Sequence, residues 1–281
     1  MKTVNSLSGG KTSSYIAVNY PADFNVFSLV RTNDKNCMFP DKKLRQVVSD
    51  KLGGIEFIGT LEMDTIIYTM LDLEQMIGSK IDWVTGITFE KVVDTKGGWL
   101  PSMLRRFCTT EMKMKPIMEW WQKELNEVCE MRIGFRANEM RRANSLNKRL
   151  ENGIQKSKFV VGKSKNGRNK WAELDWRKPT YPLISKDNPI FKDDIEKFWK
   201  DKTVRFAEIN NCVGCFHRNP LLLNKMWKTH TNKMEWFEKQ EHKGKGTWKE
   251  NMNYQEIKDW ELQTELNWDD FDECDSGYCG L

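Results

Sequence analysis

The sequence predicts an α/β protein with a doubly wound, mostly parallel sheet. Three observations on its 281 residues lead to this fold class. Short apolar runs alternate with helix-period segments through the first half, a glycine-rich turn follows the first apolar run, and one later stretch has the pattern of a β-hairpin. Such alternation is typical of a parallel sheet with helices on both faces.

The first half supplies the alternating elements in order. Residues 24–30 are a compact apolar run between polar breaks, as in a buried parallel strand. Further strands are expected at residues 3–7, 55–58 and 130–135. The expected helices lie at residues 11–19, 41–52, 64–76, 110–125 and 138–150. Gly53 and Gly54 end the second of these helices, and Pro116 lies awkwardly inside the fourth.

The second half departs from this alternation. The turn signal Lys165-Asn166-Gly167-Arg168 stands between two β-prone stretches and predicts an inserted hairpin at about residues 157–176. A helix is expected at 193–201, and the chain from Cys212 onwards is helical in pattern and rich in Trp and Lys. We therefore expect an α/β domain over 1–205 and a C-terminal helical appendage over 206–281.

Composition limits the classes of function. Charged residues make up 30% and hydrophobic residues 39%, as in ordinary soluble proteins. No apolar run approaches the roughly 20 residues of a membrane span, and Met1-Lys2-Thr3 leads directly into an apolar segment. We expect a cytoplasmic protein with no signal peptide and no membrane partner. The net charge of +5 mildly favours anionic partners such as nucleotides, sulfate esters and nucleic acid.

The segment Val4–Ser14 combines a strand, a glycine-rich turn and a helix start. Such a turn presents backbone N–H groups to an anion, and the helix dipole favours negative charge there. Glycines let the backbone approach a phosphate closely, and hydroxyl and ammonium groups add donors. The candidate phosphate-binding residues are Ser8, Gly9, Gly10, Lys11, Thr12 and Ser13. The spacing is not that of a Walker loop, and an ordinary tight turn is the alternative.

This loop resembles the pyrophosphate-binding loop, Ser-Gly-Gly-x-Asp-Ser, of the PP-loop superfamily. That superfamily includes ATP pyrophosphatases, base thiolation enzymes and the phosphoadenylyl sulfate (PAPS) reductases. The resemblance implies a Rossmann-like fold of the HUP type and a bound adenine nucleotide, either ATP or a sulfonucleotide, PAPS or adenylyl sulfate (APS). Thr12 stands where many members carry Asp. This departure would weaken the organisation of a Mg²⁺ ion at the loop.

Two further segments resemble motifs of the same superfamily. Residues 106–117 look like its Cys-Thr-x-x-x-Lys-x-x-Pro segment, with Cys108 and Lys113 in register. Residues 134–142 are similar to Gly-x-Arg-x-x-Glu-x-x-Arg at a strand end, where ligands of open α/β sheets bind. The resemblance implies catalytic roles for Lys113 and Arg136, and nucleotide binding by Arg136, Glu139 and Arg142. Arginines suit phosphate or sulfate because they form charged, bidentate hydrogen bonds.

The Tyr181-Pro182-Leu183 segment also resembles one found in the family, and we expect it to be structural. A solvated helix face is the alternative interpretation of the arginines.

The seven cysteines argue against a disulfide framework in a cytosolic protein. Cys212 and Cys215 form a C-x-x-C pair, which suits half of a zinc site or a redox dithiol. Zinc would need two more ligands; the candidates are His217, Cys274 and Cys279. The resemblance to iron–sulfur members implies instead that Cys108, Cys212 and Cys215 hold a [4Fe–4S] cluster with one open iron, Cys274 being a candidate fourth ligand. Reduced structural thiols are the third alternative.

The last three residues, Cys279-Gly280-Leu281, resemble part of the Glu-Cys-Gly-Leu-His tail of PAPS reductases. The resemblance implies Cys279 as a catalytic nucleophile. The motif's His is missing, and its Glu precedes Cys274 instead. Acidic neighbours are expected to raise the pKa of the thiol, which opposes an easily formed thiolate. Incidental thiols in a tail are the alternative.

Two enzymatic functions and one binding function follow. In the preferred one, ATP adenylates a base of tRNA or DNA, pyrophosphate leaves into the loop at residues 8–14, and sulfur, supplied with a cysteine desulfurase partner, replaces AMP. In the second, Cys279 reduces APS or PAPS to sulfite with a thioredoxin-like partner. In the third, the chain binds a nucleotide without catalysis, which the Thr12 departure favours.

The Lys-rich stretch at residues 225–249 contains Trp227, Trp236 and Trp248. It could bind nucleic acid through phosphate contacts and base stacking. The alternative is an amphipathic helical face that covers the core with snorkelling lysines.

Overall fold

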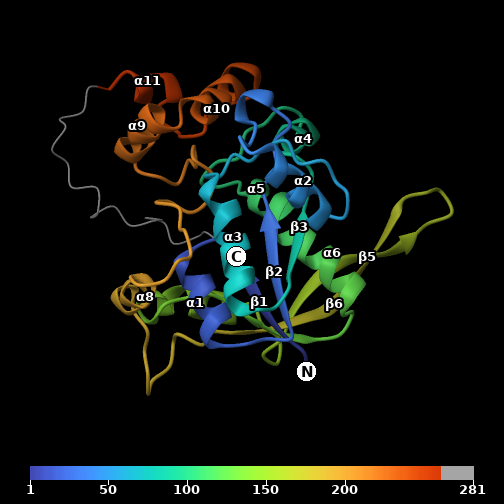
Figure 1. Ribbon diagram of the computed structural model, residues 1–281. Helices are drawn as coiled ribbons and strands as arrows, with labels where there is room; N and C mark the ends of the chain where they lie inside the picture. Colours follow the sequence, from blue (N-terminus) through green and yellow to red (C-terminus); the bar gives the residue numbers. More distant parts are fainter. Residues whose placement is uncertain (261–281) are drawn as a thin grey trace. The chain divides into compact units, whose positions relative to one another are not determined.

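The computed structural model describes residues 1–260, so Cys274 and Cys279 lie outside the described residues (Figure 1). Its strands are β1 (Thr3–Leu7), β2 (Phe24–Leu29), β3 (Ile81–Thr85), β4 (Cys129–Arg132), β5 (Gln155–Lys163) and β6 (Asn169–Thr180). Its α-helices are α1 (Lys11–Asn19), α2 (Lys42–Lys51), α3 (Thr65–Ile77), α4 (Phe89–Thr95), α5 (Phe107–Thr109), α6 (Lys115–Glu124), α7 (Met140–Asn147), α8 (Lys192–Trp199), α9 (Pro220–Thr229), α10 (Thr231–Lys243) and α11 (Tyr254–Lys258). Three short helical turns are η1 (Lys35–Cys37), the π-helical η2 (Thr110–Met114) and η3 (Ala137–Glu139).

The strands form one six-stranded sheet in the order β3-β2-β1-β4-β6-β5. β1 pairs in parallel with β2 and β4, β4 pairs in parallel with β6, and β5 pairs antiparallel with β6. The expected α/β class with a mostly parallel sheet is therefore confirmed. Among residues 1–260, no helix combines the length and the apolar character that crossing a membrane requires.

Residue contacts divide the chain into two compact units. Unit 1 consists of Met1–Phe27, Thr69–Asp82 and Ile117–Phe206. Unit 2 consists of Ser28–Tyr68, Trp83–Pro116 and the chain from Ala207. A unit boundary falls at Phe206, close to the expected one, but two segments expected in the 1–205 domain, Ser28–Tyr68 and Trp83–Pro116, belong to unit 2.

Unit 1 buries its strands under aromatic side chains of its helices. The ring of Trp121 in α6 lies 4.8 Å from that of Phe159 in β5. Tyr15 of α1 and Phe198 of α8 meet edge to face, with their ring centroids 4.9 Å apart. Cys129 of β4 is completely buried, as expected of a thiol that serves as a small hydrophobic residue.

Unit 2 has a core built largely from its C-terminal helices. Trp236 and Trp248 are 2% and 0% exposed, and Trp227 is also buried. The indole N–H of Trp236 donates to Glu90 at 2.9 Å. The indole N–H of Trp248 donates to the carbonyl of Phe237 at 2.8 Å, and that of Trp227 donates to the carbonyl of Tyr254 at 3.1 Å. Buried rings cannot stack on nucleic-acid bases. The stacking role expected for these three tryptophans is therefore wrong, and the alternative of a helical face covering the core is confirmed.

Several local expectations are confirmed and others need correction. The inserted hairpin is present as β5 and β6. Pro116 lies inside a continuous helical run, as expected, and directly follows the π-helical turn η2, where the ordinary α-helical hydrogen-bond pattern is already interrupted. Residues 55–58 form no strand; the segment pairs only through isolated bridges of Gly59 with Thr32 and Met38. β3 was not expected, because its residues alternate between buried and partly exposed positions instead of forming a continuous apolar run.

Candidate nucleotide loop and thiol pocket

The loop between β1 and α1 in unit 1 has the backbone of a phosphate-binding turn. Gly9 has a φ of 81°, in the left-handed region that favours glycine. Gly10 precedes α1 in an extended conformation, and no side chain caps the helix there within the described residues. The first backbone N–H groups of α1 are therefore left to other acceptors. An anion is the natural acceptor at this end of a helix.

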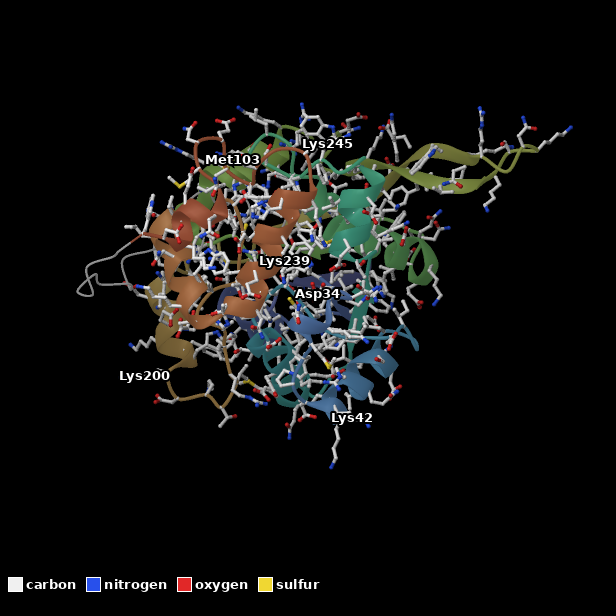
Figure 2. The ribbon with its side chains drawn as sticks, turned by 90° about the horizontal axis from the view of Figure 1, so that it is seen from above. Asp34, Lys42, Met103, Lys200, Lys239 and Lys245 are labelled. Atoms are coloured by element: carbon white, nitrogen blue, oxygen red, sulfur yellow. The ribbon has the colours of Figure 1, made fainter. Side chains whose placement is uncertain are left out.

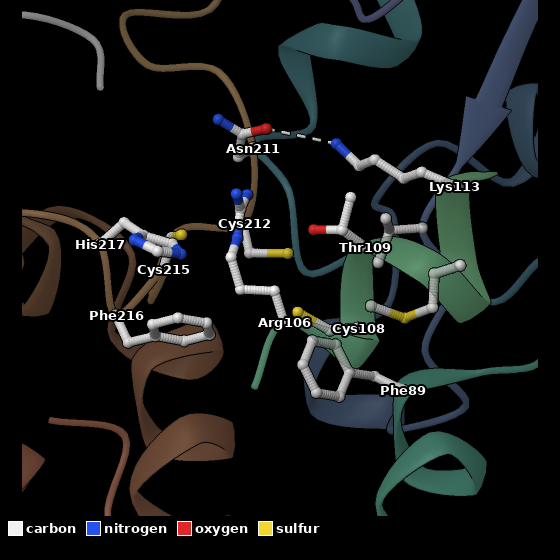
Figure 3. Close-up of a pocket in the computed structure, with 12 residues that line it drawn as sticks. Phe89, Arg106, Cys108, Thr109, Lys113, Asn211, Cys212, Cys215, Phe216 and His217 are labelled. Carbon is white, nitrogen blue, oxygen red and sulfur yellow. Dashed lines mark hydrogen bonds between the residues drawn. The ribbon is translucent and has the colours of Figure 1, made fainter. Parts of the chain in front are cut away.

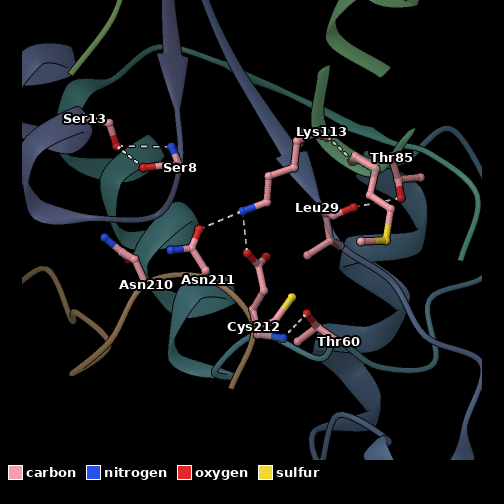
Figure 4. A network of polar contacts seen from close by, with 12 residues as sticks. Ser8, Ser13, Leu29, Thr60, Thr85, Lys113, Asn210, Asn211 and Cys212 are labelled. Atoms are coloured by element: carbon pink, nitrogen blue, oxygen red, sulfur yellow. Dashed lines mark hydrogen bonds and ion pairs between the residues drawn. The ribbon is translucent and has the colours of Figure 1, made fainter. Parts of the chain in front are cut away.

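Ser13 shapes the loop from inside. Its Oγ accepts the backbone N–H of Ser8 at 3.1 Å, lies 3.1 Å from the hydroxyl of Ser8, and donates to the carbonyl of Gly10 at 3.1 Å (Figure 4). Ser13 is buried. Its hydroxyl thus holds the turn closed, which is a different role from the direct phosphate contact expected from the sequence.

The Gly134 motif lies against this loop. A Cβ atom placed on Gly134 would be 3.4 Å from Cγ2 of Thr12 and 3.5 Å from the backbone nitrogen of Ser13. Two motifs that are far apart in the sequence therefore meet within unit 1. Lys11 forms an ion pair with Glu196 of α8, and its carbonyl accepts the indole N–H of Trp199 at 3.0 Å. The expected phosphate ligand Lys11 is thus held by α8.

Arg136, Glu139 and Arg142 form one charged cluster in unit 1. Glu139 accepts from Nε of Arg136 at 3.1 Å, from the backbone N–H of Arg136 at 2.8 Å and from Nη1 of Arg142 at 2.5 Å. Burial acts to raise the pKa of Glu139, but the backbone hydrogen bond and the two guanidinium charges outweigh it and hold the pKa below its usual value. The carboxylate therefore fixes both arginines in place.

The three cysteines expected to bind a cluster line one pocket of unit 2. Its cavity of about 50 Å³ has room for a few water-sized atoms. Figure 3 shows the pocket, with Cys108 on the α5 segment and Cys212 and Cys215 on the segment before α9. The remaining lining residues are Val30, Phe89, Arg106, Thr109, Met112, Lys113, Asn211, Phe216 and His217.

Neighbouring backbone fixes the C-x-x-C turn. The N–H of Cys215 donates to the carbonyl of Cys212 at 3.1 Å, and the N–H of Val213 donates to the carbonyl of Leu61 at 2.8 Å. A Cβ atom on Gly214 would lie 2.4 Å from Cδ2 of Phe237, so only glycine fits there without a shift. The turn that carries the two cysteines is therefore fixed by two other segments of unit 2, through a backbone hydrogen bond to Leu61 and through packing against the ring of Phe237.

The pocket itself disfavours thiolates. Burial raises the pKa of Cys108 to about 11, and the nearby Cys215 adds to the effect. Burial also raises the pKa of Cys212 well above its usual value; Glu62 and the other two thiols act in the same direction, and Lys113 opposes them. All three thiols line the same cavity. Thiolate ligands would need a cation to form here.

The donor set fits a soft metal centre by its chemistry. Three thiols facing one partly apolar pocket are what iron–sulfur clusters and zinc use. His217 also lines the pocket, and burial, aided by Arg106 and Lys249, lowers its pKa to about 4, which keeps its imidazole in the neutral, metal-binding form. In residues 1–260, no three His, Cys, Asp or Glu side chains are already gathered at metal-binding positions.

Lys113 is engaged by a buried carboxylate. Its Nζ lies 2.8 Å from Oε1 of Glu62 and 3.3 Å from Oδ1 of Asn211 (Figure 4). Glu62 is 1% exposed and forms an isolated β-bridge with Cys212. Sequence reasoning missed Arg106, Asn211 and Glu62. Arg106 and Asn211 flank the cysteine motifs and could have been suspected, whereas nothing in the sequence near Glu62 indicates its role.

The predicted site residues therefore fall into two groups. Unit 1 carries the phosphate loop with its arginine motif, and unit 2 gathers Cys108, Lys113, Cys212 and Cys215. Cys274 and Cys279 lie beyond the described part of the chain. Neither a scan against protein-family models nor a search of curated proteins finds a match for this chain.

Proposed function

We propose that this chain is a Rossmann-like PP-loop enzyme that binds an adenine nucleotide in unit 1 and carries out sulfur chemistry at the thiol pocket of unit 2. The preferred reaction is ATP-dependent transfer of sulfur to a nucleic-acid base. The observation that carries the proposal is the thiol pocket, because Cys108 and the Cys212–Cys215 pair come from distant segments and still line one cavity.

The nucleotide half of the reaction needs a site for departing pyrophosphate. An oxygen of the base attacks the α-phosphorus of ATP, the bond to the β-phosphate oxygen breaks, and pyrophosphate leaves. The backbone N–H groups at the start of α1, with Gly9 and Gly10 beside them, are suited to the charge that develops on it. Arg136 is held by Glu139 and offers a fixed guanidinium to the phosphates. Thr12 supplies no carboxylate, so any Mg²⁺ would be held mainly by the nucleotide phosphates.

The thiol half needs a sulfur carrier. Cys108, Cys212 and Cys215 would hold a [4Fe–4S] cluster through their thiolates, and zinc with His217 is the competing occupant. When bound by three thiolates, such a cluster supplies an open iron position for a sulfur atom. The side chains of Phe89 and Phe216 keep the cavity partly apolar, and the carboxylate of Glu62 fixes the ammonium group of Lys113, which also lines the cavity.

The metal assignment is tested by reconstituting the full chain with iron and sulfide under anaerobic conditions. We expect visible charge-transfer absorbance and bound iron, both lost in Cys212→Ala. Cys129→Ala is the matched control, because Cys129 is a buried core thiol outside the pocket and its loss should leave the absorbance intact. Equal iron binding by the two variants would reject the cluster, and zinc binding alone would replace it with the zinc alternative.

The reaction is tested on the same preparation with ATP plus nucleic acid and, separately, with PAPS or APS. Release of AMP and pyrophosphate together with a thiolated base supports sulfur transfer. Sulfite release that Cys279→Ser abolishes would overturn it in favour of sulfonucleotide reduction with a thioredoxin-like partner. Tight nucleotide binding with neither product would leave only the non-catalytic binding function.

A further inference from the structure

The hairpin of β5 and β6 in unit 1 reaches beyond the strands that support it. Only the last four residues of β6, Arg177–Thr180, pair with β4. The two hairpin strands pair with each other from Gln155 and Arg177 out to Lys163 and Asn169. The outer part is therefore a two-stranded ribbon, and Figure 1 shows the β5–β6 hairpin reaching out past α6. The proposed nucleotide loop uses none of its residues.

The outer ribbon is strongly positive. Residues 158–171 contain no Asp or Glu. The ribbon's cationic residues are all exposed; Lys163, Lys165, Arg168 and Lys170 lie towards the tip, whereas Lys158 faces Glu173 across the ladder. By contrast, Lys156 at the base is paired with Glu151 at 2.6 Å. Like charges concentrated on one ribbon repel one another, so an anionic partner relieves a cost that the free protein carries.

The same ribbon exposes an aromatic side chain. Trp171 is 58% exposed, although Trp176 on the same strand is buried. Val161, near it on the other strand, is 50% exposed. An indole held in water beside cationic groups is the arrangement with which proteins stack on unpaired bases and neutralise the adjacent phosphates.

We propose that residues 158–171 bind single-stranded nucleic acid, with the lysines and Arg168 on the phosphates and Trp171 stacked on a base. A duplex keeps its bases stacked on each other, so it would leave Trp171 without that contact. An anionic membrane surface fits less well, because one indole and one valine offer little apolar area to insert. The inference rests on the proposed function for the idea that a nucleic-acid base is the acceptor, but binding itself needs neither nucleotide nor sulfur.

The experiment measures binding of the full chain to fluorescently labelled oligothymidylate and oligouridylate by anisotropy at several salt concentrations. Each phosphate contact with a single strand contributes about −0.7 to the slope of log affinity against log salt. Replacing Lys163, Lys165, Arg168 and Lys170 by Gln should therefore make the slope shallower by up to about 2.8. Trp171→Ala should weaken binding roughly 5-fold or more, and Trp171→Phe should restore most of it, because a phenyl ring still stacks.

The matched control removes the same charge elsewhere. Lys42, Lys43, Lys186 and Lys200 are exposed and lie outside the hairpin (Lys42 and Lys200 are labelled in Figure 2). Their replacement by Gln should leave the salt slope nearly unchanged. Circular dichroism of each variant shows whether the fold is kept.

The inference is overturned if the hairpin variant binds like this control, if duplex binds more tightly than single strand, or if only anionic phospholipid vesicles are bound. DNA and RNA arms that bind alike support it through their shared chemistry. If the chain binds single strands but transfers no sulfur, this inference stands and the proposed reaction is rejected. If it transfers sulfur but the hairpin does not bind single strands, the proposed reaction stands and this inference is rejected.

Discussion

Replacing Lys113 by Met tests whether its buried ion pair is structural or catalytic. Nζ of Lys113 lies 2.8 Å from Oε1 of Glu62, and the two side chains are 18% and 1% exposed. Met keeps most of the length and apolar volume of the lysine and removes its charge. The variant therefore leaves the Glu62 carboxylate buried beside Cys212 without the ammonium group that balances it.

The expected loss is large for a single substitution. Breaking a buried ion pair by removing one partner costs about 3–5 kcal/mol. Lys113 is partly exposed, so water offsets some of that loss and we expect about 3 kcal/mol. With about 2–4 °C per kcal/mol for a chain of this size, the melting temperature should fall by roughly 6–12 °C.

A double-mutant cycle separates the two roles. Glu62→Gln combined with Lys113→Met removes both charges and should recover most of the lost stability, because no unpaired buried charge remains. The assays are urea unfolding followed by tryptophan fluorescence, and AMP release from ATP. If Lys113 acts on the nucleotide or on sulfur, the double variant recovers stability but not activity.

Lys115→Met is the control, because Lys115 is half exposed and its contact with Glu111 is 3.6 Å long. That change should cost at most about 0.5 kcal/mol. If Lys113→Met is no more destabilising than this control, the reasoning about the buried pair is refuted. If the double variant regains activity together with stability, Lys113 has no chemical role.

Further substitutions probe three other parts of the structure. Gly214→Ala should cost about 1–3 kcal/mol and lose iron, with partial rescue by Phe237→Leu, because the new methyl group meets that ring; urea unfolding and an iron assay measure both. Trp236→Ala should cost about 3–5 kcal/mol in the same unfolding experiment, whereas Trp171→Ala should stay within about 0.5 kcal/mol. The pKa of Glu139 is lowered from 4.5, so the stability that its charge contributes is complete above that pH and is lost as pH falls through the folded-state pKa. The Glu139→Gln variant should therefore be less stable than the parent at neutral pH, and its melting temperature should change less with pH in acid. Thermal melts at a series of pH values measure both effects.

The elements that could be predicted from the sequence are those whose signals are local. β1, the glycine turn and α1 have the expected bounds, because an apolar run, two glycines and a helix start follow one another directly. Residues 55–58 are apolar too, but Gly59 approaches so closely that a Cβ atom there would lie 1.9 Å from the carbonyl oxygen of Cys37. That contact with a distant segment, which no local pattern reveals, takes the place of a strand.

The site divides in the same way. The C-x-x-C spacing singles out Cys212 and Cys215, and the resemblance of residues 106–117 to a PP-loop motif adds Cys108, so all three could be chosen before the fold was known. Glu62 could not, because its position beside Lys113 exists only once the backbone at Leu61 and Glu62 pairs with that at Cys212 and Val213. Residues whose role depends on such pairing become visible only in three dimensions.

The tryptophans show that the position of a residue within its helix or strand predicts its exposure better than the composition of the surrounding segment does. The Lys-rich stretch with Trp227, Trp236 and Trp248 matched the expected make-up of a nucleic-acid surface, yet all three rings lie in the core, Trp227 and Trp236 from helices α9 and α10 and Trp248 from the segment after α10. In β6, Trp171 and Trp176 are five positions apart, and an odd separation in a strand sends side chains to opposite faces. If Trp176 is buried, Trp171 must face the other way, on the face that it shares with Glu173 and, across the ladder, with Lys158. The alternation of the strand therefore decides which tryptophans can stack on a base, and the number of tryptophans does not.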